Sequence, residues 1–574
     1  MVLNVAARGV ARVPPAFRLL LWCGAGAILV QALLAWLARN PFDFSPAFAY
    51  LLRAFDGHGN AVLAVLAVAA FLLRRQQAAL EAVRLAADHT WTLAAAAFVL
   101  YGAGAWFAYR AYPLAMDEYV AWFQAQAFAA GKLGGQFPPD LLDQLLPRLP
   151  ANYFLVASRA TGEVSGAYLP GFALLAAPFA CAGVPWLANP AISALTLPAL
   201  RGLVLELSES REAAGWAILL TLASPVVAVN AFGYYAMPAH LLCSVLYAWL
   251  LLRPTIGRAL AAGVVGSLAL ALHNPAPHLL FAAAFVVWLV ARRTPVTILL
   301  ALAAGYAPLT ALLWFGWQQH LASLMAAAPP ATHAAVPAVA TPSASGPGAV
   351  ERVFAQVGSA ISLPTPRTLA ARLAGLAKAW TWASAGLFVL AAWGFAVARA
   401  LPAVRVLAAA LAVTFFGYFL VPFDQGHGWG YRYLHSAWFV LPVLAGLGLA
   451  RADDELRAMA IWAVLLSLVV ANGLRASQAE LFVRQHLAQV PPLAAMPMGA
   501  GDPARPEIVF VDPTAGAYTR DMVHNDPFLR GDRKVMVYDG HAATQALMAR
   551  RFPGYTLASD GRWGALWTKE GGRK

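Results

Sequence analysis

Long runs of apolar residues recur along most of the chain, and they constrain its fold more than any other feature. A helix needs about 20 apolar residues to cross the hydrocarbon core of a bilayer. Of the 574 residues, 61% are hydrophobic and 12% are charged, whereas a soluble protein carries about 25% charged residues. A water-soluble enzyme is therefore excluded for most of the length. The candidate spans are 17–38, 58–73, 91–109, 167–187, 189–206, 213–232, 237–252, 258–272, 276–291, 296–316, 376–398, 403–420, 434–450 and 457–473.

Arginine residues flank many of the turns between these runs. The formal net charge is +13. On a polar chain this excess would indicate a nucleic-acid partner, but beside apolar runs it is typical of cytoplasmic loops. We therefore expect no nucleic-acid partner. The turns assigned to the cytoplasm contain Arg74, Arg75, Arg84, Arg253, Arg258, Arg292, Arg293, Arg399, Arg405, Arg451 and Arg457.

Neighbouring cytoplasmic turns must be separated by an even number of crossings. The rule holds except between Arg84 and Arg253, where an odd number of runs lies, so one of them does not cross. The best candidate is 167–187, which contains Pro170 and Pro178, because proline breaks helices and broken segments at membrane depth line polar cavities. We predict about 13 transmembrane helices plus this re-entrant or broken segment, with the N-terminus cytoplasmic and the C-terminus outside. The first run is too long for a signal-peptide core, so we expect a retained anchor.

This topology leaves two long loops, 110–166 and 317–375, and the tail 474–574 on the outer side. The tail has an α/β pattern. It contains expected strands at 507–512 and 535–539, a helix at 541–552 and a closing strand pair at 555–568. Residues 326–350 are rich in Ala, Pro and Ser, which is typical of a lid or a linker.

The expected fold class is an all-α polytopic membrane protein with a small C-terminal α/β domain. We divide it into extra N-terminal transmembrane helices (1–90), a catalytic transmembrane module (91–473) that carries both long outer loops, and a small periplasmic domain (474–574). We expect it in the bacterial inner membrane. Long ordered loops are usually functional, so chemistry is expected at the outer face.

Two adjacent acids open the first outer loop. Asp117 and Glu118 follow a membrane span directly. An exposed acidic pair is most often solvated surface, but a carboxylate at the membrane face can act as a general base on an acceptor hydroxyl. In a helix the two side chains point about 100° apart, so they need not share a role. We take both as candidate catalytic residues.

The most distinctive string is 423–435, FDQGHGWGYRYLH, at the outer end of a span. An aromatic belt with one snorkelling arginine would explain its aromatic residues and Arg432, but explains Asp424 and His427 less well. The arginine fork matches the oxygens of an anion such as a phosphate, so Arg432 is a candidate anion-binding residue, with His427 and Tyr433 near it. Weaker candidates in the first outer loop are Lys132, Arg148 and Arg159.

Several histidines lie near the outer ends of spans. Polar groups at membrane depth tend to be functional, so His240 and His278, with Tyr168 and Asp424, are candidate cavity residues. No cofactor is required by the sequence. A divalent metal on histidine with Asp117 or Glu118 stays open, although no helical metal-ligand spacing supports it. The chain's three cysteines, Cys23, Cys181 and Cys243, lie in apolar runs without metal or disulfide spacing.

These motifs resemble the GT-C superfamily of integral-membrane glycosyltransferases, and most of all the branch of protein O-mannosyltransferases and aminoarabinose transferases. The resemblance rests on the acidic pair after a span, on 168–171 (YLPG) and on 224–240, which ends in His240. It covers about residues 91–300, with a weaker match at 421–450. The chain departs from the family in two respects. Two spans precede the span that leads to the acidic pair, where many relatives have a single one, and His240 stands where relatives often have an acid.

The resemblance implies a polyprenyl-phosphate sugar donor, transfer with inversion, Asp117 as general base and the lipid phosphate as leaving group. For such a donor we predict that Arg432 binds the phosphate, with His427 and Tyr433 near it. It leaves hexosyl and pentosyl transfer open, and a lipid, a glycan or a protein as acceptor. The alternative function is a transporter or flippase of a lipid-linked sugar. Transporters place ionisable residues within spans and often show internal repeats, whereas the acidic pair follows a span here, so the enzyme is favoured.

Overall fold

The computed structural model describes residues 13–40, 42–149, 153–326, 362–495 and 506–569. In that part of the chain, seven helices are long and apolar enough to cross a membrane. The protein is therefore an integral membrane protein. The seven are α1 (Pro15–Arg39), α2 to α3 (Pro46–Leu72), α5 with its last turn (Thr90–Ala108), α9 with the turn before it (Pro185–Ser208), α15 to α16 (Val296–Ala326), α20 with its last turn (Pro402–Leu420) and α22 to α23 (Asp454–Leu487).

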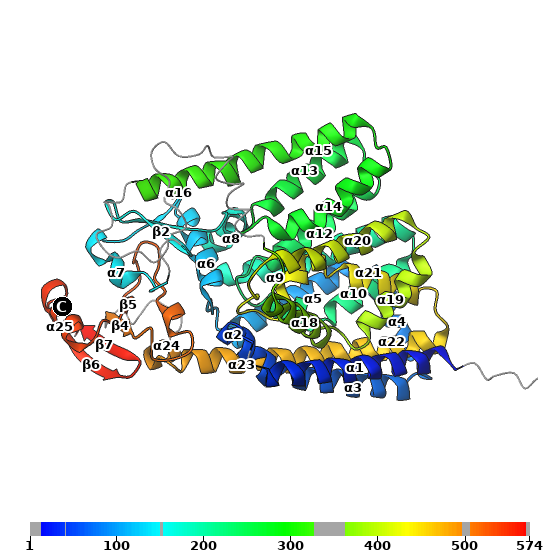
Figure 1. Cartoon of the computed structure of the whole chain (residues 1–574), viewed down its shortest axis with the longest axis horizontal. Helices are drawn as coiled ribbons and strands as arrows, with labels where there is room; N and C mark the ends of the chain where they lie inside the picture. The colour runs from blue at the N-terminus through cyan, green and yellow to red at the C-terminus, as the bar shows by residue number, and fades with distance from the viewer. Residues whose placement is uncertain (1–12, 41, 150–152, 327–361, 496–505, 570–574) are drawn as a thin grey trace, which may run out of the picture.

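Shorter apolar helices complete the bundle, as predicted from the remaining apolar runs (Figure 1). They are α8 (Gly171–Cys181), α12 (Met237–Leu252), α13 (Ile256–Leu270), α14 (Ala276–Ala291), α19 (Leu387–Ala398) and α21 (Val440–Leu449). The eleven residues of α8 rise only about 16 Å, roughly half of a hydrocarbon core.

Two apolar runs that were expected as single helices are divided. The run 376–398 contains the end of α18 (Pro366–Thr381) and all of α19, and Gly386 between them has a φ of 80°. Glycine adopts this left-handed conformation without steric cost. The run 213–232 breaks between α10 (Arg211–Leu222) and α11 (Pro225–Asn230). Proline has no amide hydrogen and so begins a helix more easily than it continues one.

The last span continues further than expected. The predicted span ended at 473, but α23 (Asn472–Leu487) prolongs α22 (Asp454–Leu466) through a π-helical turn. The continuous helix runs along one side of the bundle, beside α1 and α3 (Gly57–Leu72), and leads to the C-terminal strands (Figure 1). The first residues of the predicted tail, 474–487, are therefore helical.

Two small sheets lie at one end of the bundle, which we name the sheet end (Figure 1). The first outer loop forms an antiparallel sheet of order β1-β3-β2. The tail forms a sheet of order β5-β4-β7-β6, in which β4 and β5 are parallel. The strands are β1 (Gly135–Gln136), β2 (Leu155–Ala157), β3 (Glu163–Gly166), β4 (Glu507–Val511), β5 (Arg533–Val537), β6 (Tyr555–Gly561) and β7 (Gly564–Lys569).

The C-terminal strands and the helix α25 (His541–Arg551) form the small α/β domain that the sequence predicts. Its apolar face packs on the first loop: Phe123 shares one core with Phe510 and Met536. The predicted low-complexity stretch 326–350 lies, except for its first residue, outside the described residues. The arginine-flanked turns before α15 and α22 lie at the end of the bundle opposite the sheets (Figure 1).

A buried cluster of charges fastens the N-terminal helices to the rest of the bundle. The Asp56 carboxylate, which precedes α3, lies 2.7 Å from Lys378 Nζ on α18 and 3.7 Å from Arg475 Nη1 on α23. Trp382 Nε1 donates a hydrogen bond to it at 2.7 Å. All three charged side chains are 1% exposed. Because isolated charges are costly away from water, these helices are held in one arrangement.

We predict that Asp56→Ala destabilises the fold by roughly 3–5 kcal/mol, because it leaves two buried cations without their carboxylate. Thermal unfolding in detergent measures the effect. The control is Asp43→Ala. The Asp43 carboxylate is 91% exposed and pairs with Arg367, so the unfolding midpoint of this variant should match that of the wild type. Equal midpoints for both variants would contradict the structural role of the cluster.

Candidate active site

Helix α6 (Met116–Ala129) presents the acidic pair at the sheet end. Asp117 and Glu118 lie in its first turn, where unpaired backbone N–H groups and the helix dipole favour negative charge. The two carboxylates point in different directions, as their adjacent positions in a helix require. Asp117 reaches a cavity, whereas Glu118 turns into the protein.

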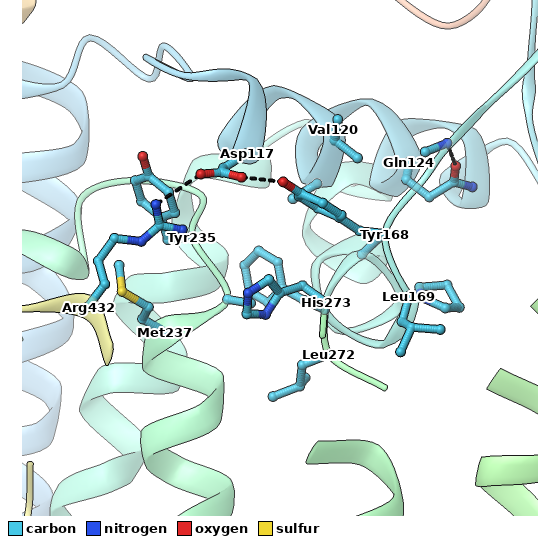
Figure 2. A pocket seen from close by; sticks show the side chains of 16 residues that line it. Asp117, Val120, Gln124, Tyr168, Leu169, Tyr235, Met237, Leu272, His273 and Arg432 are labelled. Atoms are coloured by element: carbon cyan, nitrogen blue, oxygen red, sulfur yellow. Dashed lines mark hydrogen bonds and ion pairs between the residues drawn. The ribbon is translucent and has the colours of Figure 1, made fainter. Parts of the chain in front are cut away.

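Asp117 is held between two partners from distant segments (Figure 2). Arg432 Nη1 lies 2.9 Å from one carboxylate oxygen, and the Tyr168 hydroxyl donates a hydrogen bond to the other. Burial acts to raise the pKa of Asp117, but the charge and hydrogen bond of Arg432 and the hydrogen bond from Tyr168 outweigh it, so the pKa lies below its ordinary value. The carboxylate is therefore ionised.

The glycine-rich string before Arg432 wraps around its side chain. Arg432 Nη1 also donates to the carbonyl oxygens of Gln425 at 3.0 Å and His427 at 2.8 Å. The guanidinium lies over the Tyr235 ring, 4.3 Å from its centroid. Gly428 has a φ of 142°, and a Cβ there would lie 2.2 Å from Arg432 Cδ. A side chain at this position would displace the arginine.

The cavity beside this ion pair is lined by polar side chains and by an apolar wall (Figure 2). Its open volume, with the solvent at its mouth included, is about 460 Å³. Asp117, Arg432 and His273 belong to the polar lining, while Met237 and Leu272 belong to the apolar wall. Burial, followed by the charge of Arg432, lowers the pKa of His273 to about 4. The cavity thus combines one carboxylate, one guanidinium and a neutral imidazole.

Glu118 joins two loops. Its carboxylate accepts hydrogen bonds from the backbone N–H groups of Leu114 at 2.7 Å and Tyr234 at 3.2 Å. It is 0% exposed. A Cβ on Gly233 would lie 2.2 Å from Glu118 Oε1, so the glycine allows the loop to approach. Glu118 therefore positions the first outer loop against the loop before α12.

The other predicted site residues divide into two groups. Tyr168 lines the cavity. His240 and His427 each contact a residue that lines the cavity. His240 Nε2 is 3.0 Å from His273 Nδ1, and His427 Nδ1 is 2.7 Å from the Tyr235 hydroxyl. Sequence reasoning did not select Tyr235 or His273 as site residues, although both stand in or beside the motifs it quoted.

Three predicted residues are engaged elsewhere. Tyr433 stacks on Tyr418, with centroids 4.2 Å apart. Asp424 accepts hydrogen bonds from the backbone N–H and the hydroxyl of Ser45, both at 2.7 Å. His278 Nε2 lies 2.7 Å from the Tyr306 hydroxyl. None of the three lines the cavity that contains Asp117.

The weaker phosphate candidates do not reach the cavity either. Arg148 pairs with Asp539, and Arg159 pairs with Asp143 at 2.7 Å. Lys132 is exposed. Within the described residues, no group of three or more His, Cys, Asp or Glu side chains is arranged to hold a metal ion. Arg432 is the cation that lines the cavity described above.

No protein-family model and no curated protein matches the sequence. Among solved structures, the chain is similar to the crystal structure of ArnT from Cupriavidus metallidurans bound to undecaprenyl phosphate. The TM-score is 0.51 and the identity 12%, over 83% of this chain and 96% of that chain. The chain therefore shares the fold of that ArnT. The apo structure of the same ArnT has a TM-score of 0.48, with the same identity and coverage.

We predict that Glu118 makes stability fall as the pH rises. Burial raises its pKa from 4.5 to about 8, against the lowering effect of its backbone hydrogen bonds. Between about pH 4.5 and 8 the folded state therefore keeps a proton that the unfolded state has lost, so stability falls through this window. The unfolding midpoint of Glu118→Gln, subtracted from that of the wild type across pH 4.5–8, should reveal this slope. A pH-independent difference would contradict it.

Proposed function

We propose that this protein is a glycosyltransferase that moves a sugar from a polyprenyl-phosphate donor to an acceptor at the outer face of the bacterial inner membrane. The observation that carries the proposal is the ion pair of Asp117 and Arg432 in a cavity with an apolar wall. The fold that the chain shares with ArnT and the undecaprenyl phosphate bound to that structural neighbour support it. In this orientation the sheet end faces the periplasm and the arginine-flanked turns face the cytoplasm.

Arg432 is suited to bind the donor phosphate. A guanidinium forms two parallel hydrogen bonds with phosphate oxygens, and the apolar wall around Met237 and Leu272 suits the first isoprenoid units. As the bond from the anomeric carbon to the phosphate oxygen breaks, the leaving polyprenyl phosphate gains negative charge. Arg432 stabilises that charge in a site that is largely shielded from water.

Asp117 is suited to act as the general base. It takes the proton of the acceptor hydroxyl while the acceptor oxygen attacks the anomeric carbon from the side opposite the phosphate. The displacement inverts the configuration at that carbon. Tyr168, which donates a hydrogen bond to Asp117, fixes the orientation of the carboxylate.

The ion pair also makes the order of binding matter. Without donor, Arg432 holds Asp117 ionised and lowers its pKa, which makes it a weak base. A donor phosphate competes with the Asp117 carboxylate for the Arg432 guanidinium and neutralises the positive charge of the guanidinium. Donor binding therefore frees Asp117 and raises its basicity, so the donor binds before the acceptor reacts.

We predict that Arg432→Ala weakens binding of undecaprenyl phosphate by about tenfold or more, since it removes charge-assisted hydrogen bonds. Binding to the purified protein in lipid nanodiscs measures the effect. The control is Arg159→Ala, which removes an arginine already paired with Asp143 outside the cavity. Unchanged affinity in Arg432→Ala would remove this residue from the phosphate site.

We predict that Asp117→Asn reduces sugar transfer by about 10²–10⁴-fold, because the general base is lost, while undecaprenyl phosphate still binds. Mass spectrometry of surface glycolipids, glycans and glycoproteins in a deletion strain identifies the missing sugar. Complementation then compares the wild type, Asp117→Asn and the control Asp143→Asn. Full restoration by Asp117→Asn would overturn the base assignment and favour a transporter of lipid-linked sugar.

A further inference from the structure

A row of buried rings leads from the ion pair toward the C-terminal domain. Tyr235, under the Arg432 guanidinium, bonds through its hydroxyl to His427. The His427 ring lies 5.2 Å from Phe482, which in turn lies 6.2 Å from His486 on α23, measured between ring centroids. The first half of the row thus connects the glycine-rich loop to the helix that enters the C-terminal domain.

The row continues through the tail and returns to helix α6. His486 lies 5.8 Å from Tyr518 and 6.3 Å from Tyr112, and Tyr112 lies 5.2 Å from His524. His524 stacks on Tyr119, with centroids 4.1 Å apart. Since Tyr119 and Asp117 both belong to α6, the row begins under the Arg432 guanidinium and ends on the helix that carries Asp117. We name Tyr112, His427, His486, Tyr518 and His524 the ring cluster.

Several polar atoms of the ring cluster have no hydrogen-bond partner. They include both ring nitrogens of His486, Nε2 of His427 and the hydroxyls of Tyr112 and Tyr518. The side chains of Tyr112, His486 and His427 are only 1%, 2% and 8% exposed. Buried polar groups are nearly always hydrogen-bonded. Such a concentration of unsatisfied groups beside a reactive carboxylate indicates a place where a polar ligand completes the bonding.

The charges around the cluster select the kind of ligand. Burial lowers the pKa of both His427 and His524 to about 3, so these imidazoles are neutral. Asp521 lies close enough to Tyr112 and Tyr518 for its charge to affect them. Burial, followed by the charge of Asp117, raises the pKa of Asp521 to about 7. The cluster itself contains no lysine or arginine. Arg432 and Arg520 act on His427 and Asp521, but Arg432 is already paired with Asp117. The cluster therefore suits neutral hydroxyl groups better than a phosphate.

Building on the proposed function, we propose that the ring cluster binds the acceptor and that the acceptor hydroxyl belongs to a neutral sugar. Neutral imidazoles and tyrosine hydroxyls can each donate or accept a hydrogen bond, which matches the mixed character of sugar hydroxyls. The negative faces of the aromatic rings attract the C–H groups of a pyranose ring. Asp521 adds a carboxyl group that can bond another hydroxyl. The product is then a glycosidic bond between two sugars.

The C-terminal domain is held where this role requires it. The Tyr119 hydroxyl donates to the carbonyl oxygen of Asn525 and accepts from its N–H, both at 2.8 Å. The Asn525 side chain also donates to the carbonyl oxygen of Leu145 at 3.2 Å. These bonds fix the segment that contains Tyr518, Asp521 and His524 against the helix that carries Asp117. The tail therefore contributes side chains to the site.

The first experiment measures sugar binding directly on the full chain in nanodiscs. Saturation-transfer NMR with a panel of methyl hexosides and methyl pentosides should give signals for at least one glycoside. His486→Phe and Tyr518→Phe should each weaken that binding by about tenfold, the cost of a lost buried hydrogen bond. The matched control is His541→Phe, at the exposed start of α25. Tyr518→Phe removes a single hydroxyl, so it reports even if His486→Phe does not fold.

Undecaprenyl phosphate binding separates the two proposals. If the wild type binds undecaprenyl phosphate, and the cluster variants bind it equally well but lose glycoside signals, the acceptor site is supported. If undecaprenyl phosphate binds but no glycoside does, or the variants bind glycosides as the wild type does, the acceptor site is overturned. Absence of undecaprenyl phosphate binding in the wild type would overturn the proposed function itself.

The second experiment identifies the bond that is formed. Linkage analysis of the product missing from the deletion strain should place the transferred sugar on the hydroxyl of another sugar. A sugar attached to a lipid phosphate or to a protein side chain would overturn the proposal.

Discussion

The ion pair between Asp117 and Arg432 joins residues that are 315 positions apart in the sequence, and the arrangement of the sheet end depends on it. Asp117 comes from the first long loop, and Arg432 from the segment before α21. Neither charge has a stable position there alone, because a partly buried charge needs a partner. Three neighbours support this contact. The glycine-rich string bends around Arg432, Tyr168 bonds to Asp117, and Tyr235 lies under the Arg432 guanidinium.

Two clusters of opposite charges in this protein, around Asp56 and around Asp117, differ in how far they are open to a ligand. The Asp56 cluster has two cations for one carboxylate and is 1% exposed, so nothing from outside can replace its partners. The Asp117 carboxylate is 25% exposed and the Arg432 side chain 12% exposed, and both open into a cavity. A ligand phosphate can therefore exchange with the carboxylate only at the second cluster. Rigid pairing and exchangeable pairing coexist in one bundle.

The sequence predicted much of the architecture because its signals are local. Apolar runs, arginine-flanked turns and the prolines of 167–187 report on a residue's immediate surroundings, and so do the alternating strands of the tail. Asp117 and Arg432 could be selected by chemical type and by their place after a span. The inward rotation of Glu118, the stacking of Tyr433 and the pairing of Asp424 with Ser45 could not. These depend on which distant segment packs nearby, as does the role of His486, which lies at the end of a helix that no local pattern extended that far.

The helix that continues from α22 into α23 has a consequence for exchanging parts between proteins of this fold. Its 34 residues carry Arg475, which meets the N-terminal helices, and three turns later His486, which meets the tail. A chimera that replaced the tail alone, or the first three helices alone, would pair one end of this continuous helix with a segment from another protein. The N-terminal helices, this continuous helix and the tail therefore have to be exchanged together, although the N-terminal helices lie at the opposite end of the sequence from the other two.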